Sequence, residues 1–199
     1  MKAIDRTEVL GLADYETIRD RFRTRVIAEK KRRRVQLGPK ATALFENRDT
    51  VLLQIQEMLR TERISRPAAI QHEIDTYNET VPGTDELSCT VMIEIVEKPE
   101  RDAFLQAVAG FEDHVWLTAC GERIRARSAD RAGLEPGRTT AVHYLKFPLP
   151  PLVAEALRAA AEPGASKPTL ELAVLHPAYT VRVEVPRETI VELGEDLRA

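Results

Sequence analysis

The amino-acid sequence predicts an α+β fold, in which a helical N-terminal part packs with a mainly antiparallel sheet built from hairpins and flanking helices. Before about residue 85, apolar residues recur at the 3.6-residue spacing of helices. From residue 88 they alternate with polar residues, as in strands, and short glycine- or proline-containing turns separate the runs. We therefore expect a helical part over 1–85 and a sheet part over 86–199, packed as one compact unit.

The first part is expected to hold three helices and one strand. Tyr15, Ile18 and Phe22 share one helical face, which predicts a long helix over 14–34 with Asp14 as its N-cap. Further along, the pattern predicts a strand over 41–46, a helix over 48–62 capped by Asn47, and a third helix that begins after Ser65. The segment 81–84 (VPGT) ends the helical pattern.

The second part is expected to consist of hairpins and short helices. Gly121 and Glu122 suit a two-residue turn between strands over 114–120 and 123–129. A second hairpin turns at His176 and Pro177. The remaining predicted elements are a strand over 88–96, a helix over 99–109, a strand over 139–147, a helix over 151–161 and a last helix after Pro186.

Composition excludes several classes of protein. No apolar run approaches the roughly 20 residues of a membrane span, and the N-terminus lacks a signal-peptide pattern, so we expect no membrane association. Two cysteines, Cys89 and Cys120, are too few for a disulfide scaffold, and a cytoplasmic location is expected. The sequence contains no GxSxG, P-loop, GxGxxG or CxxC motif, so nothing in it names an enzymatic reaction.

A strongly basic segment over 19–34 is the most distinctive feature of the chain. It contains nine basic and two acidic residues, a net charge of +7 in a chain of net charge −3, so the remainder carries −10. On a helix, four of its cations fall in one stripe beside the apolar face, and we predict that this stripe contacts a polyanion. The four are Arg19, Arg23, Lys30 and Arg34. The alternative is a solvated helix face, or pairing with acids of the same chain.

A second basic surface is predicted in the first hairpin. Arg123, Arg125 and Arg127 alternate along one strand, so their side chains share a face. With a turn at residues 121 and 122, Trp116 lies opposite Arg127, a geometry that favours a cation–π contact. Such a face can bind nucleotides by stacking, although exposed arginines also protect sheets from aggregation.

A weak metal site is the remaining candidate. His72 and Asp75 are three residues apart on the third predicted helix, and Glu57 or Glu73 could add a carboxylate. No HExxH motif and no second ExxH motif supports it, so the sequence predicts no cofactor while leaving a divalent metal open. His143 is expected to point into the core.

Four separated runs of sequence resemble a bacterial family of unknown function, domain-of-unknown-function family 3501. The runs are 30–39 (KKRRRVQLGP), 52–60 (LLQIQEMLR), 73–79 (EIDTYNE) and 141–147 (AVHYLKF). The resemblance covers most of the chain and implies no catalytic residues. Members of that family lie near genes for rubrerythrin-like proteins and iron–sulfur oxidoreductases, which implies a redox or oxidative-stress setting.

Three functions are therefore in competition. The first is a non-enzymatic binding protein whose basic surfaces contact a phosphate-rich ligand, nucleic acid or an acidic protein. The second is an accessory redox or metal protein. The third is a subunit of a homo-oligomer, in which the basic helix packs against the acidic part of another copy.

Overall fold

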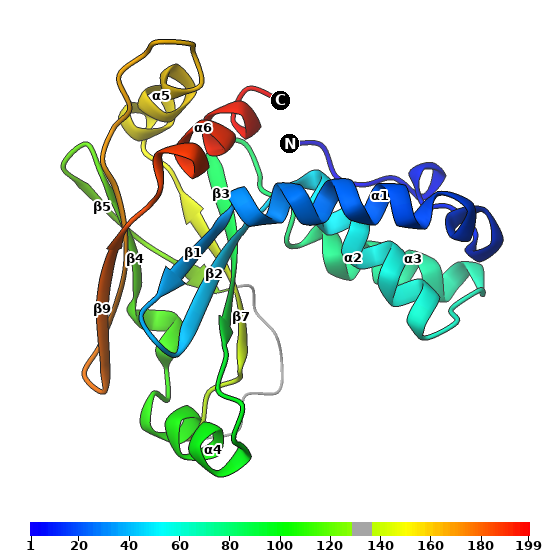
Figure 1. Ribbon diagram of the computed structural model, residues 1–199, viewed down its shortest axis with the longest axis horizontal. Coiled ribbons are helices and arrows are strands. Elements are labelled where there is room, and N and C mark those ends of the chain that lie inside the picture. Colours follow the sequence, from blue (N-terminus) through cyan, green and yellow to red (C-terminus); the bar gives the residue numbers. More distant parts are fainter. Residues whose placement is uncertain (129–136) are drawn as a thin grey trace.

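The computed structural model describes residues 1–128 and 137–199, and it confirms the α+β fold (Figure 1). Two short 3-10 helices, η1 and η2, span Arg6–Glu8 and Phe111–His114. The α-helices are α1 (Leu12–Arg32), α2 (Arg48–Thr61), α3 (Pro67–Asn78), α4 (Lys98–Ala107), α5 (Pro151–Ala160) and α6 (Arg187–Asp196). The strands are β1 (Arg34–Leu37), β2 (Ala41–Glu46), β3 (Glu86–Ile93), β4 (Val115–Ala119), β5 (Glu122–Arg125), β6 (Arg127–Ser128), β7 (Val142–Pro148), β8 (Leu170–His176) and β9 (Tyr179–Glu184).

The strands form two antiparallel sheets. Sheet A has the order β1-β2-β3-β7-β6, and sheet B has the order β5-β4-β8-β9. At one margin the chain crosses from β5 in sheet B to β6 in sheet A, where the Ala126 amide donates to the Val115 carbonyl. At the other margin, the Tyr179 hydroxyl of β9 donates to the Leu37 carbonyl of β1. The sheets are thus linked along both margins.

The main hydrophobic core lies between the two sheets. Because alternate residues of each strand face inward, Phe45 and Leu145 of sheet A pack in one cluster with Leu117 and Leu172 of sheet B. Each of these four side chains is fully buried. The low aromatic content, 5% of the chain, leaves this core dominated by aliphatic side chains. No helix among the described residues is long and apolar enough to cross a membrane.

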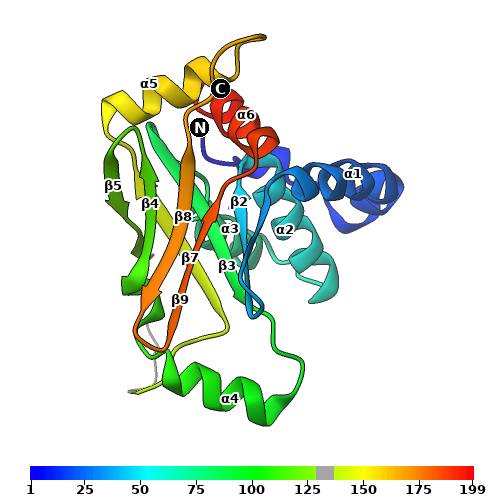
Figure 2. The same ribbon diagram turned by 60° about the vertical axis from the view of Figure 1, so that its left-hand side comes forward.

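The helices occupy distinct places around the sheets. Both views show α1, α2 and α3 together on one side, α5 and α6 at one end and α4 at the opposite end (Figures 1 and 2). Val51, Ile55 and Ile74 of α2 and α3 form a second buried cluster with Ile4 and Val9 from the N-terminal segment. Strands β1 and β2, from the first half of the chain, pair directly with β3.

Two expected elements differ from the structure. The helix predicted over 14–34 starts at Leu12 with Gly11 as its N-cap and ends at Arg32. Residues 34–37 then form β1, which places Val35 and Leu37 in the core. The cations Lys30, Lys31 and Arg32 favour a helix end here, but no glycine or proline directly follows, so burial of Val35 and Leu37 decides where the helix ends.

The first hairpin turns one residue earlier than expected. Ala119 pairs with Glu122, so the loop is Cys120 and Gly121, with φ of +52° and +81°. Both loop residues therefore lie in the left-handed region that two-residue hairpin turns favour. The register changes accordingly, and Trp116 lies opposite Arg125 rather than Arg127. Residue 129, the last of the expected second strand, lies outside the described residues.

Candidate functional site

The cations of the basic segment 19–34 divide into a paired and an unpaired group. The paired residues, each within 4 Å of a carboxylate, are Arg19, Arg25, Arg32, Arg33 and Arg34. Within residues 1–128 and 137–199, no carboxylate lies that close to Arg21, Arg23, Lys30 or Lys31. Internal pairing therefore accounts for part of the positive charge and, among the described residues, leaves four cations of α1 without a carboxylate within 4 Å.

Arg19 is held against α2. Its Nε and one terminal nitrogen each donate to Glu57 at 2.8 Å, and the Tyr15 hydroxyl donates to the same carboxylate at 2.7 Å. The hydrogen bond from Arg19 is the main cause that lowers the pKa of Glu57. Burial and the neighbouring carboxylate raise the pKa of Tyr15. Arg19 and Glu57 thus tie α1 to α2, and both are already engaged by partners of the same chain.

Arg33 lies in a buried acidic cluster that the sequence did not reveal. Its side chain is 2% exposed. It contacts Glu29 at 3.2 Å, Glu192 at 3.2 Å and, more closely, Asp196. Asn47 also donates to Glu29. Glu29 and Arg33 are four residues apart, and Glu192 and Asp196 of α6 contact Arg33 beside them. The available sequence signal for this cluster was the pair of acids Glu192 and Asp196, which lie four residues apart on α6.

Arg34 does not belong to the predicted stripe on the helix. It is the first residue of β1, and its guanidinium lies 3.5 Å from Glu94, with both side chains about half exposed. Arg23 and Lys30 remain on α1, where they lie seven residues apart, which is about two helical turns. Lys31 follows Lys30 on α1 but projects about 100° further round the helix, so it extends the basic surface sideways and does not continue the stripe.

The predicted arginine ladder is divided between the two sheets. Arg123 lies over the Trp116 ring at 4.2 Å from its centroid, and Arg125 lies at 6.0 Å. Arg125 also donates to the Asp113 carboxylate at 2.7 Å. Arg127 instead belongs to β6, where it pairs with Lys146 of sheet A. The expected contact between Trp116 and Arg127 is therefore replaced by contacts with Arg123 and Arg125.

The two basic surfaces lie on different sides of the protein. Both ribbon views place α1 on the side away from β4 and β5 (Figures 1 and 2). Sheet A and the core lie between them, because the inner faces of the two sheets pack together. Arg23 and Lys30 therefore do not form one continuous site with Arg123 and Arg125.

The predicted metal ligands are not brought together. Gln71 donates to Asp75 at 2.8 Å, and Glu57 is engaged by Arg19 and Tyr15. Among residues 1–128 and 137–199, no three histidine, cysteine, aspartate or glutamate side chains are grouped so that they could hold a metal ion. His72 is exposed on α3, while Glu73 is half-buried. His143 is buried as expected, stacked on Phe111 and 3.6 Å from Glu112.

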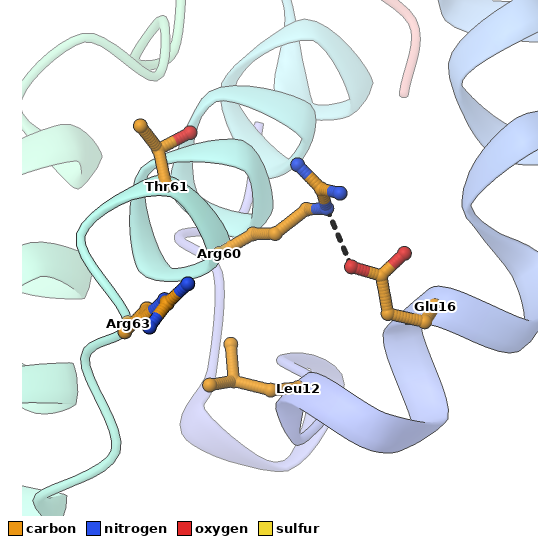
Figure 3. A pocket seen from close by; sticks show the side chains of 5 residues that line it. All are labelled: Leu12, Glu16, Arg60, Thr61 and Arg63. Atoms are coloured by element: carbon orange, nitrogen blue, oxygen red, sulfur yellow. Dashed lines mark hydrogen bonds and ion pairs between the residues drawn. The ribbon is translucent and has the colours of Figure 1, made fainter.

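An open pocket of about 510 Å³ lies between the first turn of α1 and the last turn of α2 (Figure 3). Leu12 and Glu16 line it from α1, and Arg60, Thr61 and Arg63 line it from the end of α2. Arg60 donates to Glu16 at 2.6 Å across the pocket. A smaller apolar pocket on another part of α1 is lined by Ile18, Phe22 and Leu52 among others. Neither pocket was predicted, because each joins residues of α1 and α2 that are 30 or more positions apart.

Comparisons with known proteins identify a family but no activity. The family model for a protein of unknown function, DUF3501, matches residues 3–197. A crystal structure of a protein of unknown function from Burkholderia pseudomallei K96243 is similar in fold, with a TM-score of 0.88 and 32% sequence identity. That match covers 98% of this chain and 100% of the other. No curated protein matches. The chain therefore belongs to the DUF3501 family of proteins of unknown function.

Proposed function

We propose that this chain is a non-enzymatic binding protein that contacts an acidic protein partner through the unpaired cations of α1. The observation that carries the proposal is the lack of a carboxylate within 4 Å of Arg21, Arg23, Lys30 and Lys31 in the part of the chain that the structure describes. Arg21, Arg23 and Lys31 are exposed and Lys30 is half-buried. These side chains attract negative charge at little desolvation cost, since they are not deeply buried.

An apolar pocket on the same helix favours a protein over a nucleic acid. Ile18 is 43% exposed beside Phe22 and Leu52, in a pocket of about 60 Å³. Arg25 lies over the Phe22 ring, 5.3 Å from its centroid, and Arg21 immediately precedes Phe22. An apolar side chain of a partner can enter this pocket while acidic neighbours meet the arginines. A phosphate backbone offers no such apolar group.

A second copy of this chain is one acidic partner that meets these requirements, because the sequence outside the basic segment carries a net charge of −10. Attraction between charges weakens as salt screens them. A self-association of this kind would therefore dissociate in a light-scattering series of rising salt concentration, whereas association with another protein would leave the isolated chain monomeric at every salt concentration.

Elution from columns of immobilised polyglutamate and of double-stranded DNA tests the proposal. Replacement of Arg23, Lys30 and Lys31 by Gln should abolish retention on polyglutamate, since it removes three unpaired charges and breaks no ion pair of the described residues. Circular dichroism should show an unchanged fold. Equal retention of the variant and the unmodified protein would refute the proposal. Retention of the unmodified protein on DNA alone would identify a nucleic acid as the partner instead.

A further inference from the structure

The pocket between α1 and α2 has a basic lining with one arginine in an unusual backbone conformation. Arg63 has a φ of +52°, in the left-handed region that favours glycine. It follows the end of α2, where the Ile64 amide donates to the Leu59 carbonyl at 2.9 Å and the Arg63 amide to the Arg60 carbonyl at 3.3 Å. This pair of bonds forms a Schellman motif, whose left-handed position is usually occupied by glycine. The Schellman motif therefore explains why residue 63 has a positive φ, but it does not explain why that residue is an arginine.

The side chain of Arg63 lines the pocket. Figure 3 shows Arg60 reaching from the end of α2 towards Glu16 on α1, while the Arg63 side chain lies at the α2 end of the pocket, away from Glu16. Glu16 neutralises one of the two cations, through the 2.6 Å contact with Arg60. Within the described ranges, no carboxylate lies within 4 Å of Arg63. Two guanidinium groups and one carboxylate thus line the pocket, with one more basic than acidic side chain.

The start of α1 borders the pocket and carries both the positive end of the helix dipole and the acidic Asp14. Leu12, which lines the pocket, is the first residue of α1, and the N-cap residue Gly11 offers no side chain to the first-turn amides. The amino end of a helix carries a partial positive charge. A cation near the end of α2 also complements the dipole of that helix, so a purely structural role for Arg63 is the competing explanation.

We propose that this pocket binds a small molecule bearing a carboxylate or phosphate group, with Arg63 as its principal anchor and Arg60 as its second. A guanidinium presents paired donors that match either oxyanion. Glu16 then acts as an internal competitor, since an incoming anion must share Arg60 with it. The volume of about 510 Å³ is within the range of small-molecule sites.

Two variants separate a binding role from a structural role. Arg63→Gly should weaken binding by about tenfold or more, the loss expected for one charge-assisted hydrogen bond. The same variant should keep or slightly raise the melting temperature, because glycine suits the left-handed position. Glu16→Gln should strengthen binding about threefold, because it frees Arg60 from a partly exposed ion pair. Arg66→Gln, an exposed residue outside the pocket lining, is the matched control and should change neither quantity.

The experiment titrates the full chain with inorganic phosphate and, separately, with succinate, and follows the backbone amides by NMR. Saturable shifts at Leu12 and at residues 60–64, with either probe, are the expected result, and the stronger probe identifies the oxyanion. The proposal is overturned if neither probe gives saturable shifts there, or if Arg63→Gly binds as tightly as the unmodified protein. A fall in melting temperature of Arg63→Gly without loss of binding would establish the structural role.

Discussion

Arg33 is an arginine whose charge is compensated almost entirely inside the protein. Its side chain is 2% exposed and is surrounded by Glu29, Glu192 and Asp196. Burial raises the pKa of Asp196, and hydrogen bonding to Arg33 opposes that change. Because a buried carboxylate without its cation is strongly disfavoured, this cluster should stabilise the junction of α1, β2 and α6 only while it is complete.

Replacement of Arg33 by Met measures that dependence. The free energy of unfolding in urea should fall by about 3 kcal/mol, because three carboxylates lose a buried cation. Arg32→Met is the matched control, since Arg32 is 41% exposed and contacts Glu192 at the rim of the same cluster. It should cost less than about 1 kcal/mol. Equal losses for the two variants would contradict the account of the buried cluster.

His143 should make stability depend on pH. Burial lowers the pKa of His143, and the nearby Glu112 carboxylate opposes this effect. The unfolded chain therefore binds a proton more readily at this residue than the folded protein does. The stabilising contribution is complete above pH of about 6.5, the ordinary pKa of histidine. It is lost progressively as the pH falls below that value towards the lowered pKa of the folded protein.

Melting temperatures between pH 7.5 and pH 5.5 test whether stability falls as the pH falls. The unmodified protein should melt at a lower temperature at the acidic end, and His143→Gln should reduce that difference. His72→Gln, at an exposed position on α3, is the matched control and should leave the difference unchanged. A pH dependence that is identical in all three proteins would show that His143 does not carry it.

At the scale of elements, local sequence predicted most helices and strands but misplaced two junctions. Asn47 caps α2 as expected, with its side chain accepting from the Thr50 amide. The end of α1 was missed because the first glycine or proline after Arg32 is Gly38. The alternation of Val35 and Leu37 was too short to predict a strand between them. The turn of the first hairpin was predicted one residue too late because Cys120 adopts a positive φ, a conformation that is uncommon for cysteine.

The β1–β2 turn provides a test of how the two sheets are joined. Gly38 has a φ of +68°, and a Cβ atom there would lie 2.7 Å from the Tyr179 hydroxyl oxygen. Gly38→Ala should therefore cost more than the roughly 1 kcal/mol of left-handed backbone strain alone. Gly121→Ala isolates that strain, since Gly121 has a φ of +81° and no atom within 4 Å of the added Cβ. Equal losses in urea unfolding would mean that Tyr179 moves away freely.

Helix α3 carries the predicted metal ligands, and elemental analysis tests them. We expect no stoichiometric iron, manganese or zinc in protein purified without an affinity tag. The reason is that Glu57 is engaged by Arg19 and Asp75 by Gln71, so His72 lacks free neighbouring ligands among the described residues. A stoichiometric metal that is lost in His72→Ala would contradict this expectation.

At the scale of the whole molecule, the basic segment is partly an internal feature. Acids that neutralise it come from α2, from Glu94 just after β3 and from α6, up to 163 positions away in the sequence. Sequence periodicity places residues on one helix face but does not reveal such distant partners, so the paired and unpaired cations could not be distinguished beforehand. What remains after pairing within the described residues is a smaller set of cations on α1, which both ribbon views place on the side away from β4 and β5.

The salt dependence of polyglutamate binding tests the central claim most directly. Affinity is measured by titration over a salt series for the unmodified protein and two variants with equal loss of charge. One replaces Arg23, Lys30 and Lys31 by Gln. The other replaces Arg123, Arg127 and Lys167 by Gln; these three lie outside α1 and have no carboxylate within 4 Å among the described residues. If the unpaired cations of α1 hold the partner, the first variant should lose both the affinity and most of its slope against salt, while the second keeps both. Equal slopes in the two variants would contradict the account.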